Sequence, residues 1–400
     1  MVNSPALEAT PSASPARPGA ARAAALLVLT AGVLAAACTS GQLAERRQRL
    51  RQVVVAEVFE SAPFKADKLD SLAVWTRQGW LLATAKASDS VLVFQASDGR
   101  LLSRVGGSGR ELGRLKRPNG LAVVDDLLLI VERDNHRLQV LQLPGFEPLG
   151  VVGEELLRYP YGVAAYRATP GRFEVFVTDS YQLPDGSLPP AEELGERVKH
   201  FRLELADGHL TAALVRAFGP TVGAGILHVV ESIAIDPEYN RLLIADEASG
   251  HHDIKVFDLG GRFSGRLLGR GLFQADPEGI ALLRHSQKEG YWVTTDQQKS
   301  RTVFHLFDRR TLEYVGSFTG QVVANTDGIV VASEGVEGFP WGAVFAVHND
   351  VSVAAFAWPT VAEALGLPLA SSLPGEPRLR PPKPSPPDRL RSSRLGPATV

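Results

Sequence analysis

The chain has 400 residues, 44% of them hydrophobic, and its 38 glycines exceed the usual share of about 7%, which favours a turn-rich, all-β fold. Lysine and arginine (42) nearly balance aspartate and glutamate (44), so the bulk charge gives no reason to expect nucleic-acid binding. The single cysteine, Cys38, excludes an intramolecular disulfide framework, a multi-cysteine zinc site and an iron–sulfur cluster.

Residues 1–37 have the features of a secretory signal peptide. An apolar run from Ala23 to Ala37 is short for a membrane span but suits the hydrophobic region of such a signal. Because small residues precede Cys38, the segment resembles a bacterial lipoprotein signal, in which the cysteine becomes the lipidated first residue. Thr39 then favours the outer membrane of a Gram-negative bacterium. We expect residues 38–52 to be a linker; ordinary secretion with a free thiol is the alternative.

A short pattern recurs six times between residues 53 and 366: a polar residue, Gly or Ser, an apolar residue, Ala or Val, and an apolar residue. The copies are Asp70-Ser71-Leu72-Ala73-Val74, Asn119-Gly120-Leu121-Ala122-Val123, Tyr161-Gly162-Val163-Ala164-Ala165, Glu231-Ser232-Ile233-Ala234-Ile235, Glu278-Gly279-Ile280-Ala281-Leu282 and Asp327-Gly328-Ile329-Val330-Val331. Their spacings are 49, 42, 70, 47 and 49 residues, close to the 40–50 residue period of propeller blades in four of five cases. The repeat therefore predicts a six-bladed β-propeller.

Further apolar runs complete the expected blades. Residues 226–270 show all four strands of one blade, with a turn at Leu259-Gly260-Gly261. A surface insertion from Gln182 to Lys199, rich in Pro, Gly and Glu, explains the spacing of 70 residues. We expect the early strand from Val53 to Phe59 to join the last blade and close the ring.

The C-terminal segment, residues 367–400, carries arginine and lysine among prolines and has almost no apolar pattern. Such a segment buries too little apolar surface to offset the entropy lost on ordering, so we expect a disordered basic tail. Weak adhesion to anionic lipid or polysaccharide is the alternative to a solvated chain end.

The first residue of each repeat should face the central channel, because the first strand of every propeller blade lines it. The six residues are Asp70, Asn119, Tyr161, Glu231, Glu278 and Asp327. Four of them are carboxylates, which repel one another unless a cation lies among them. Oxygen ligands without thiolates predict calcium first and magnesium second. A single acid at a blade turn is more often a cap, but a set of four favours the metal site.

A second set of residues lies 14–21 positions further on, near the end of each second strand. It consists of Lys86, Arg133, Asp179, Asp246 with Glu247, Asp296 and His348. Cations thus belong to the first two blades and carboxylates to the fourth and fifth, where Asp276 adds another. This division suits a dianionic ligand such as phosphate, bridged between a metal and protein cations.

Two further motifs are interpreted as structural. The segment Asp134-Asn135-His136-Arg137 resembles blade turns of NHL-type propellers. The pair His251-His252 could bind a metal but follows Gly250 in an expected turn, so we interpret it as an exposed loop. No Gly-Xaa-Ser-Xaa-Gly elbow or P-loop occurs in the sequence.

Several segments together resemble the β-propeller phytases, over about residues 53–366. They are Asp70, Ala73-Val74-Trp75, Thr84-Ala85-Lys86, Glu231, Asp236-Pro237-Glu238-Tyr239-Asn240, Leu243-Ile244-Ala245-Asp246-Glu247, Asp276-Pro277-Glu278-Gly279-Ile280, Thr295-Asp296-Gln297, Phe304-His305-Leu306-Phe307-Asp308, Asn325-Thr326-Asp327-Gly328-Ile329 and Phe339-Pro340-Trp341-Gly342. The resemblance implies a calcium-dependent phosphomonoester hydrolase that releases inorganic phosphate from phytate or a related phosphorylated small molecule.

The resemblance also implies roles for individual residues. The calcium ligands would be Asp70, Glu231, Glu247, Asp276 and Glu278, with Tyr161 contacting calcium and phosphate. The phosphate-binding cations would be Lys86 and Arg133, with Asp327 near the same substrate. Calcium-activated water would attack phosphorus in line, with Glu231, Asp276, Glu278 and Tyr161 as the catalytic group.

The chain departs from the family pattern at two places. A family lysine for a second phosphate appears as Asp179-Ser180, and a Gln-Asp-Gly stretch appears as Val347-His348-Asn349. The preference for phytate is therefore left open. The alternatives are a calcium-dependent sugar lactonase, for which Lys86 and Arg133 have no evident use, and a noncatalytic NHL-like binding propeller at the cell surface. We expect a monomer anchored in the membrane through Cys38.

Overall fold

The computed structural model describes residues 52–369. Within this range the chain forms strands β1 to β25, the α-helix α2 (Trp358–Leu365) and the short 3-10 helices η1 (Ala191–Glu193), η2 (Gly223–Gly225) and η3 (Pro237–Tyr239). No helix in this range is long and apolar enough to cross a membrane. The predicted signal, Cys38, the linker up to residue 51 and the tail from residue 370 lie outside the described residues.

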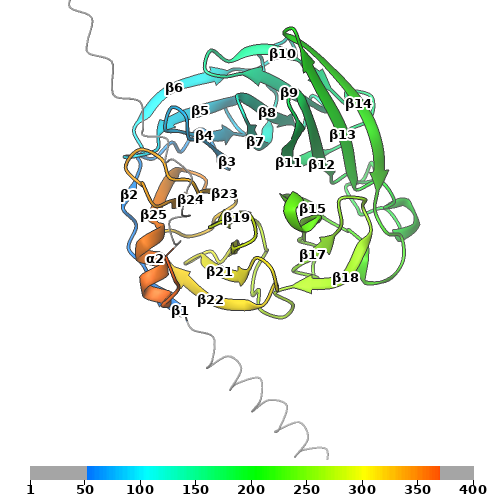
Figure 1. Cartoon of the computed structure of the whole chain (residues 1–400). Coiled ribbons are helices and arrows are strands. Elements are labelled where there is room, and N and C mark those ends of the chain that lie inside the picture. Colours follow the sequence, from blue (N-terminus) through cyan, green and yellow to red (C-terminus); the bar gives the residue numbers. More distant parts are fainter. Residues whose placement is uncertain (1–51, 370–400) are drawn as a thin grey trace, which may run out of the picture. The chain divides into compact units, whose positions relative to one another are not determined.

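The strands form six sheets arranged as the blades of a β-propeller, which confirms the predicted fold (Figure 1). From the channel outward, blades 1 to 3 consist of β3 (Leu69–Trp75), β4 (Trp80–Ala85), β5 (Ser90–Gln95) and β6 (Leu101–Gly106); β7 (Pro118–Val124), β8 (Leu127–Glu132), β9 (Arg137–Gln142) and β10 (Glu147–Val152); and β11 (Pro160–Thr169), β12 (Arg172–Asp179), β13 (Val198–Ala206) and β14 (His209–Phe218). Blades 4 to 6 consist of β15 (Val230–Asp236), β16 (Arg241–Asp246), β17 (Asp253–Phe257) and β18 (Phe263–Leu268); β19 (Ile280–Arg284), β20 (Gly290–Asp296), β21 (Val303–Asp308) and β22 (Tyr314–Thr319); and β23 (Ile329–Ala332), β24 (Ala343–His348) and β25 (Ser352–Ala357).

Two N-terminal strands complete the last two blades. β2 (Phe59–Glu60) pairs antiparallel with β25 and becomes the outer strand of blade 6. β1 (Gln52–Val54) pairs in parallel with β22 and adds a fifth strand to blade 5. The expected closing strand from Val53 to Phe59 is therefore two separate strands, and only its last residue joins the last blade.

The insertion in blade 3 separates β12 from β13 and contains η1. It ends slightly earlier than expected, because Val198 and Lys199 already belong to β13. The four strands predicted within residues 226–270 are β15 to β18, which confirms that prediction.

Six hydrophobic clusters fill the six interfaces between neighbouring blades. Both faces of a blade are therefore buried, which explains why the middle strands carry continuous apolar runs such as Leu127 to Val131 instead of an alternating pattern. α2 covers the outside of β1, β22 and β25, and its Trp358 and Val361 belong to the cluster between blades 5 and 6.

The inner strands of neighbouring blades contact one another around the whole ring, including β23 with β3. They line a central cavity of about 370 Å³. The glycines of the repeat permit this close approach: a Cβ atom on Gly162 would lie 2.2 Å from the carbonyl oxygen of Glu231, and one on Gly328 would lie 2.3 Å from that of Asp70. This is the physical reason for glycine in the repeat pattern.

Candidate metal and anion site

The first residues of the six repeats form one ring at the mouth of the central cavity. Asp70, Asn119, Tyr161 and Glu231 lie in the inner strands, and Glu278 and Asp327 come just before β19 and β23. The structure thus brings together the set predicted from the repeat. We call these six residues the channel ring.

A local irregularity of the inner strands presents the ring residues to the channel. In β3 the pairing with β4 is interrupted between Leu69 and Leu72, and β7, β11 and β15 are interrupted at the same point. Such an irregularity re-aims side chains. The freed backbone N–H of Ser71 donates to Thr84 Oγ1 (2.9 Å), which itself donates to the carbonyl oxygen of Asn119 (2.8 Å). Blade 1 is thereby joined to blade 2 at the level of the ring.

Three carboxylates form the acidic centre of the site: Glu231 and Glu278 from the ring and Glu247, which follows β16. One oxygen of each lies within 4.8 Å of the others. Burial, together with repulsion from Asp70, raises the pKa of Glu231 to about 8. Burial and mutual repulsion also hold the pKa values of Glu247 and Glu278 well above the usual range. Without a cation, this cluster keeps protons at neutral pH.

Tyr161 closes one side of this acidic cluster. Its hydroxyl donates a hydrogen bond to Glu231. Burial, followed by the charges of Asp70, Glu231 and Glu278, raises the pKa of Tyr161 well above its usual value. The hydroxyl therefore stays protonated and is available as a donor.

Lys86 lies on the opposite side of the ring and is shared by two acids. Its Nζ is 2.5 Å from Asp70 Oδ2 and 3.4 Å from Asp327 Oδ2. Although burial opposes its charge, these two carboxylates raise the pKa of Lys86 above its usual value. Burial and Asp70 raise the pKa of Asp327 to about 7, and the side chain of Gln297 donates to Asp327 Oδ1.

In the set predicted near the ends of the second strands, the aspartates lie one position before the structural equivalents of Lys86 and Arg133. Val230 in β15 pairs with Asp246 and Pro160 in β11 pairs with Asp179, so these acids end the second strands. They are buried and bind the backbone of the loop that precedes the inner strand instead of facing the channel. The residues that follow these acids and Asp296, and so correspond to Lys86 and Arg133, are Ser180, Glu247 and Gln297.

Asp246 illustrates the structural role of these acids. It accepts hydrogen bonds from the backbone N–H groups of His228 (3.0 Å) and Val229 (3.0 Å), and Lys255 Nζ lies 2.6 Å from its Oδ2. Although burial opposes ionisation, Lys255 and these hydrogen bonds lower the pKa of Asp246 to about 2. Asp179 and Asp296 hold the corresponding loops of blades 3 and 5.

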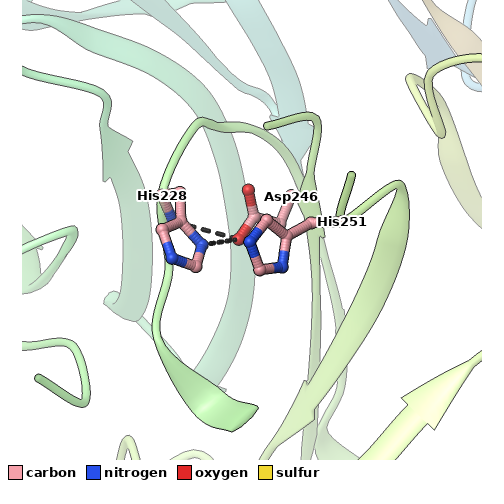
Figure 2. Close-up of side chains that lie close together, drawn as sticks. All are labelled: His228, Asp246 and His251. Carbon is pink, nitrogen blue, oxygen red and sulfur yellow. Dashed lines mark hydrogen bonds and ion pairs between the residues drawn. The ribbon is translucent and has the colours of Figure 1, made fainter. Parts of the chain in front are cut away.

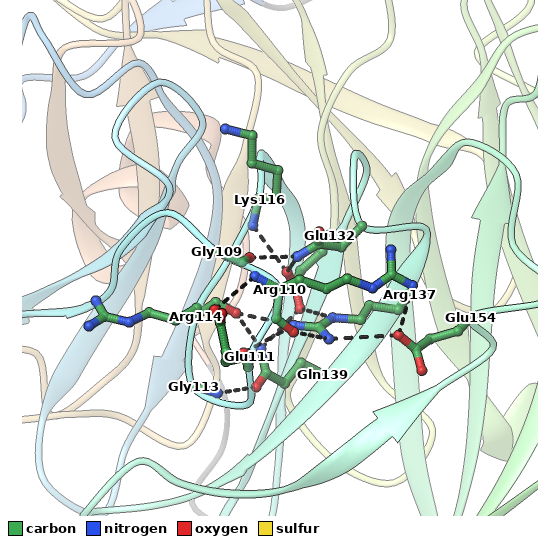
Figure 3. Close-up of polar contacts among 11 residues, drawn as sticks. Gly109, Arg110, Glu111, Gly113, Arg114, Lys116, Glu132, Arg137, Gln139 and Glu154 are labelled. Atoms are coloured by element: carbon green, nitrogen blue, oxygen red, sulfur yellow. Dashed lines mark hydrogen bonds and ion pairs between the residues drawn. The ribbon is translucent and has the colours of Figure 1, made fainter.

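Glu132, which the sequence interpretation passed over, has this role in blade 2. Figure 3 shows it within a network of polar contacts, where Arg137 Nε donates to Glu132 (2.7 Å) and Gln139 Nε2 donates to the same oxygen (2.9 Å). The backbone N–H of Lys116 donates to its other oxygen (3.0 Å). Burial raises the pKa of Glu132 in spite of Arg137. Residues 133–136 are the turn of this hairpin and Arg137 begins β9, so the predicted turn segment is one residue too long at its end.

Arg133 lies on the side of blades 2 and 3, and its side chain bonds to residues outside the channel ring. Its NH1 donates to the Tyr159 hydroxyl (2.7 Å) and its Nε to Asp134 (2.7 Å). The guanidinium also lies over the Tyr159 ring, 4.7 Å from its centroid. No hydrogen bond in the described part of the chain joins Arg133 to the channel ring, so its role toward a ligand stays a prediction.

Asp276 is turned partly away from the acidic cluster. His252 Nδ1 lies 2.9 Å from Asp276 Oδ1, while the charge of Asp276 still raises the pKa of Glu247 and Glu278. His251 is exposed, as expected for the loop, but both histidines have specific neighbours, since His251 stacks on His228. The interpretation of the pair as an exposed loop holds for His251, whereas His252 is half-buried.

A third set of residues, two positions before each ring residue, repeats the division of charge. Its members are Lys68, Arg117, Tyr159, Val229, Asp276 and Asn325. Arg117 Nε is buried and has no hydrogen-bond partner among the described residues. The cations again belong to blades 1 and 2 and the carboxylate to blade 5. Extending the repeat pattern backwards by two residues would have found this set.

The donor set fits a hard divalent cation. The acidic cluster offers only oxygen atoms, and Glu247 Oε1 is buried without a hydrogen-bond partner in the described residues. Both polar side-chain atoms of Asn119, which is fully buried in the ring, also lack partners there. Carboxylate and amide oxygens are ligands that calcium takes in six- to eightfold coordination. Glu231, Glu247 and Glu278 are the residues that could hold such an ion, with Asp70 and Asp276 at its edge.

Comparison with known proteins supports a propeller with one NHL repeat. The NHL repeat matches residues 115–141, which include β8 and the Asp134–Arg137 turn, and so agrees with the resemblance of that turn. No curated protein matches the chain.

Three solved structures are similar in fold. The nidogen/laminin complex shows 15% identity and a TM-score of 0.44 over 63% of this chain and 80% of that chain. The hydrazine synthase of Kuenenia stuttgartiensis shows 10% identity and a TM-score of 0.42 over 72% of this chain and 77% of that chain. The β-propeller domain of Cps50 (Swd1) from Myceliophteria thermophila shows 10% identity and a TM-score of 0.46 over 74% of this chain and 98% of that chain. The six sheets of the structure make the chain a six-bladed β-propeller, and its residues 115–141 match the NHL repeat.

Proposed function

We propose that the protein is a calcium-dependent phosphomonoester hydrolase that releases inorganic phosphate from a phosphorylated small molecule. The observation that carries this proposal is the cluster of Glu231, Glu247 and Glu278, whose oxygens lie within 4.8 Å of one another beside a ring that also contains Lys86. Such a group of acids is costly without a cation, and Lys86 gives the other half of a site for an anion.

The acidic cluster would hold calcium, with Asp70 and Asp276 as additional ligands. When bound, the ion would neutralise phosphate charge and make a water molecule more acidic. The bound ion would also remove the repulsion that raises the pKa of Glu247 and Glu278. The three glutamates would then be ionised at neutral pH.

The other side of the ring would bind and orient the phosphate group. Lys86 offers an ammonium group and Arg133 a guanidinium that can bind two phosphate oxygens at once. The protonated hydroxyl of Tyr161 adds a neutral donor beside Glu231. In the reaction, water oxygen bonds to phosphorus as the ester oxygen leaves in line, and the products are an alcohol and inorganic phosphate. No covalent intermediate on the protein is required.

The range of substrates depends on the place where the resembling family has a second phosphate lysine. In this chain Asp179 holds the loop before β11, and the residue after it is the neutral Ser180, whose Oγ accepts from the backbone N–H of Val230. A substrate with a single phosphate group is therefore as suitable as phytate. Anchored through Cys38, the protein would act on such substrates at the outer membrane.

The test is phosphate release by the purified full-length protein from calcium phytate and from para-nitrophenyl phosphate, with calcium and with a chelator. We expect release that the chelator abolishes, and loss of turnover in Glu231→Gln with the fold retained. The exposed acid Glu334 gives a matched control, and Glu334→Gln should keep full activity. Full activity in Glu231→Gln, or release that survives the chelator, would contradict the proposal.

A noncatalytic binding propeller is the second candidate, and the NHL match over residues 115–141 favours it. In that case the metal site would stabilise the ring without turnover. Calcium would then raise the melting temperature while neither substrate releases phosphate.

A further inference from the structure

Blade 4 carries a second group of metal-binding side chains, separate from the acidic cluster. His228 precedes β15, Asp246 ends β16, and His251 lies in the following loop. One potential ligand atom of each lies within 4.8 Å of the others. Figure 2 shows the three side chains close together, with dashed lines from His228 to the Asp246 carboxylate.

Asp246 orients this group and has no free position for a metal. Its Oδ2 accepts from the backbone N–H of His228 (3.0 Å) and from His228 Nδ1 (2.9 Å), and Lys255 Nζ lies 2.6 Å away. Its Oδ1 accepts from the backbone N–H groups of Val229 (3.0 Å) and Ala248 (3.2 Å). A cation bound directly to this carboxylate would also lie close to the Lys255 ammonium group, which is unfavourable.

The hydrogen bond to Asp246 fixes the tautomer of His228. An ionised carboxylate only accepts, so Nδ1 of His228 carries the proton and Nε2 keeps its lone pair. A metal-binding histidine typically has this arrangement, with the other ring nitrogen donating to a carboxylate that orients the ring. Asp246 is buried, which holds this orientation firmly.

His251 supplies the second imidazole. Its ring stacks on that of His228 with centroids 4.1 Å apart and planes inclined by 26°. His251 is exposed and lies in a turn, so its ring can rotate to point a nitrogen at an ion bound to His228 Nε2. His228 itself keeps 22% of its side-chain surface exposed, which leaves the ion a path from solvent.

We propose that His228 and His251 bind a divalent transition metal of the zinc class, with Asp246 as the carboxylate that orients His228. Imidazole suits zinc, nickel and copper, whereas calcium takes oxygen ligands. The chain would therefore bind two kinds of cation at two places, calcium at the three glutamates and a transition metal at the loops that carry His228 and His251. Two protein ligands leave coordination positions open to water or an anion. The inference stands without the proposed hydrolase activity.

The test is calorimetric titration of the full-length protein with Zn²⁺ in excess calcium, so that calcium occupies the acidic cluster. We expect one equivalent of zinc to bind, and His251→Ala and His228→Gln each to weaken binding by about 100-fold or more, since even loss of an orienting partner costs 10- to 100-fold. His251→Ala changes an exposed loop residue and should leave the melting temperature unchanged.

His252 provides the matched control, because it neighbours His251 but contacts Asp276. His252→Ala should keep zinc binding within about threefold, well below the 100-fold loss expected for a ligand. Absence of zinc binding in the unaltered protein, or equal binding in His251→Ala, would overturn the proposal. So would loss of zinc binding in Glu278→Gln alone, because zinc would then occupy the acidic cluster.

Discussion

Asp246 and Glu247 are neighbours in the chain and carry the same charged group, yet their surroundings are opposite. Asp246 is fully buried and paired with Lys255 and three backbone N–H groups, and its pKa is lowered to about 2. Glu247 faces two other glutamates, and burial and their repulsion raise its pKa. Hydrogen bonds and an ion pair within the fold compensate the charge of Asp246. The negative charge of Glu247 has no such partner among the described residues, so only a proton or a bound cation can compensate it.

The same contrast is found in other blades. The satisfied acids, such as Glu132 and Asp246, hold the loop that leads into each inner strand and so fix the height of the channel ring. The unsatisfied acids belong to that ring and the positions beside it. Burial alone therefore does not mark a functional carboxylate. A functional carboxylate is marked by burial without a protein cation or backbone donors around it.

Removing a satisfied acid should have the largest effect. Glu132→Ala leaves the buried guanidinium of Arg137 without its carboxylate and deprives Gln139 and the Lys116 backbone of an acceptor. Removing one partner of a buried pair costs about 3–5 kcal/mol. We expect the free energy of unfolding, measured by urea denaturation, to fall by that amount. A loss below about 1 kcal/mol would show that the network of Figure 3 is not structural.

Calcium should have the next largest effect, and only at the unsatisfied acids. A ligand at 100 times its dissociation constant stabilises the native state by about 2.7 kcal/mol. We expect the melting temperature to be higher in calcium than in chelator for the unaltered protein, and this difference to vanish in Glu278→Gln. Equal melting temperatures in both buffers for the unaltered protein would contradict a calcium site at these acids.

The fold and the ring could be predicted from the sequence because both depend on a repeat. Ring residues such as Asp70 and Glu231 occupy one position of a pattern whose blade period is visible by eye, and a propeller makes equivalent positions converge. The repeat also contained the glycines, such as Gly162, that allow neighbouring strands to approach.

The second set could not be placed so well, because its position depends on strand pairing. A shift of one residue along a strand exchanges the two faces, and the sequence does not show that Val230 pairs with Asp246. The predicted set therefore held both Asp246 and Glu247, whereas only Glu247 is the structural equivalent of Lys86. The contact between His252 and Asp276 joins a loop of blade 4 to one of blade 5, and such contacts leave no periodic signal.

The pH dependence of stability in chelator should show the contrast without any mutation. In the native state Asp327 has a pKa of about 7 and Glu231 one of about 8, whereas in the unfolded chain both lose their protons near pH 4. Between these limits the native state binds more protons, so the free energy of unfolding falls as pH rises from about 5 to 8. We expect urea denaturation at pH 5 and at pH 8 to show this fall. Saturating calcium should flatten this slope, and a slope unchanged by calcium would contradict the assignment.

The smallest expected effect has the opposite sign from an ordinary buried-site mutation. Glu247→Gln keeps the shape of the side chain and removes a carboxyl group that must either hold a proton or repel its two neighbours, so in chelator at pH 8 it should raise the free energy of unfolding by about 1 kcal/mol. Glu334→Gln, at an exposed site, should change it by less than about 0.5 kcal/mol. In calcium the order should reverse, because Glu247→Gln loses a metal ligand. If Glu247→Gln destabilised the protein in chelator as well, Glu247 would belong with the satisfied acids, and the neighbouring pair would no longer distinguish the two kinds of site.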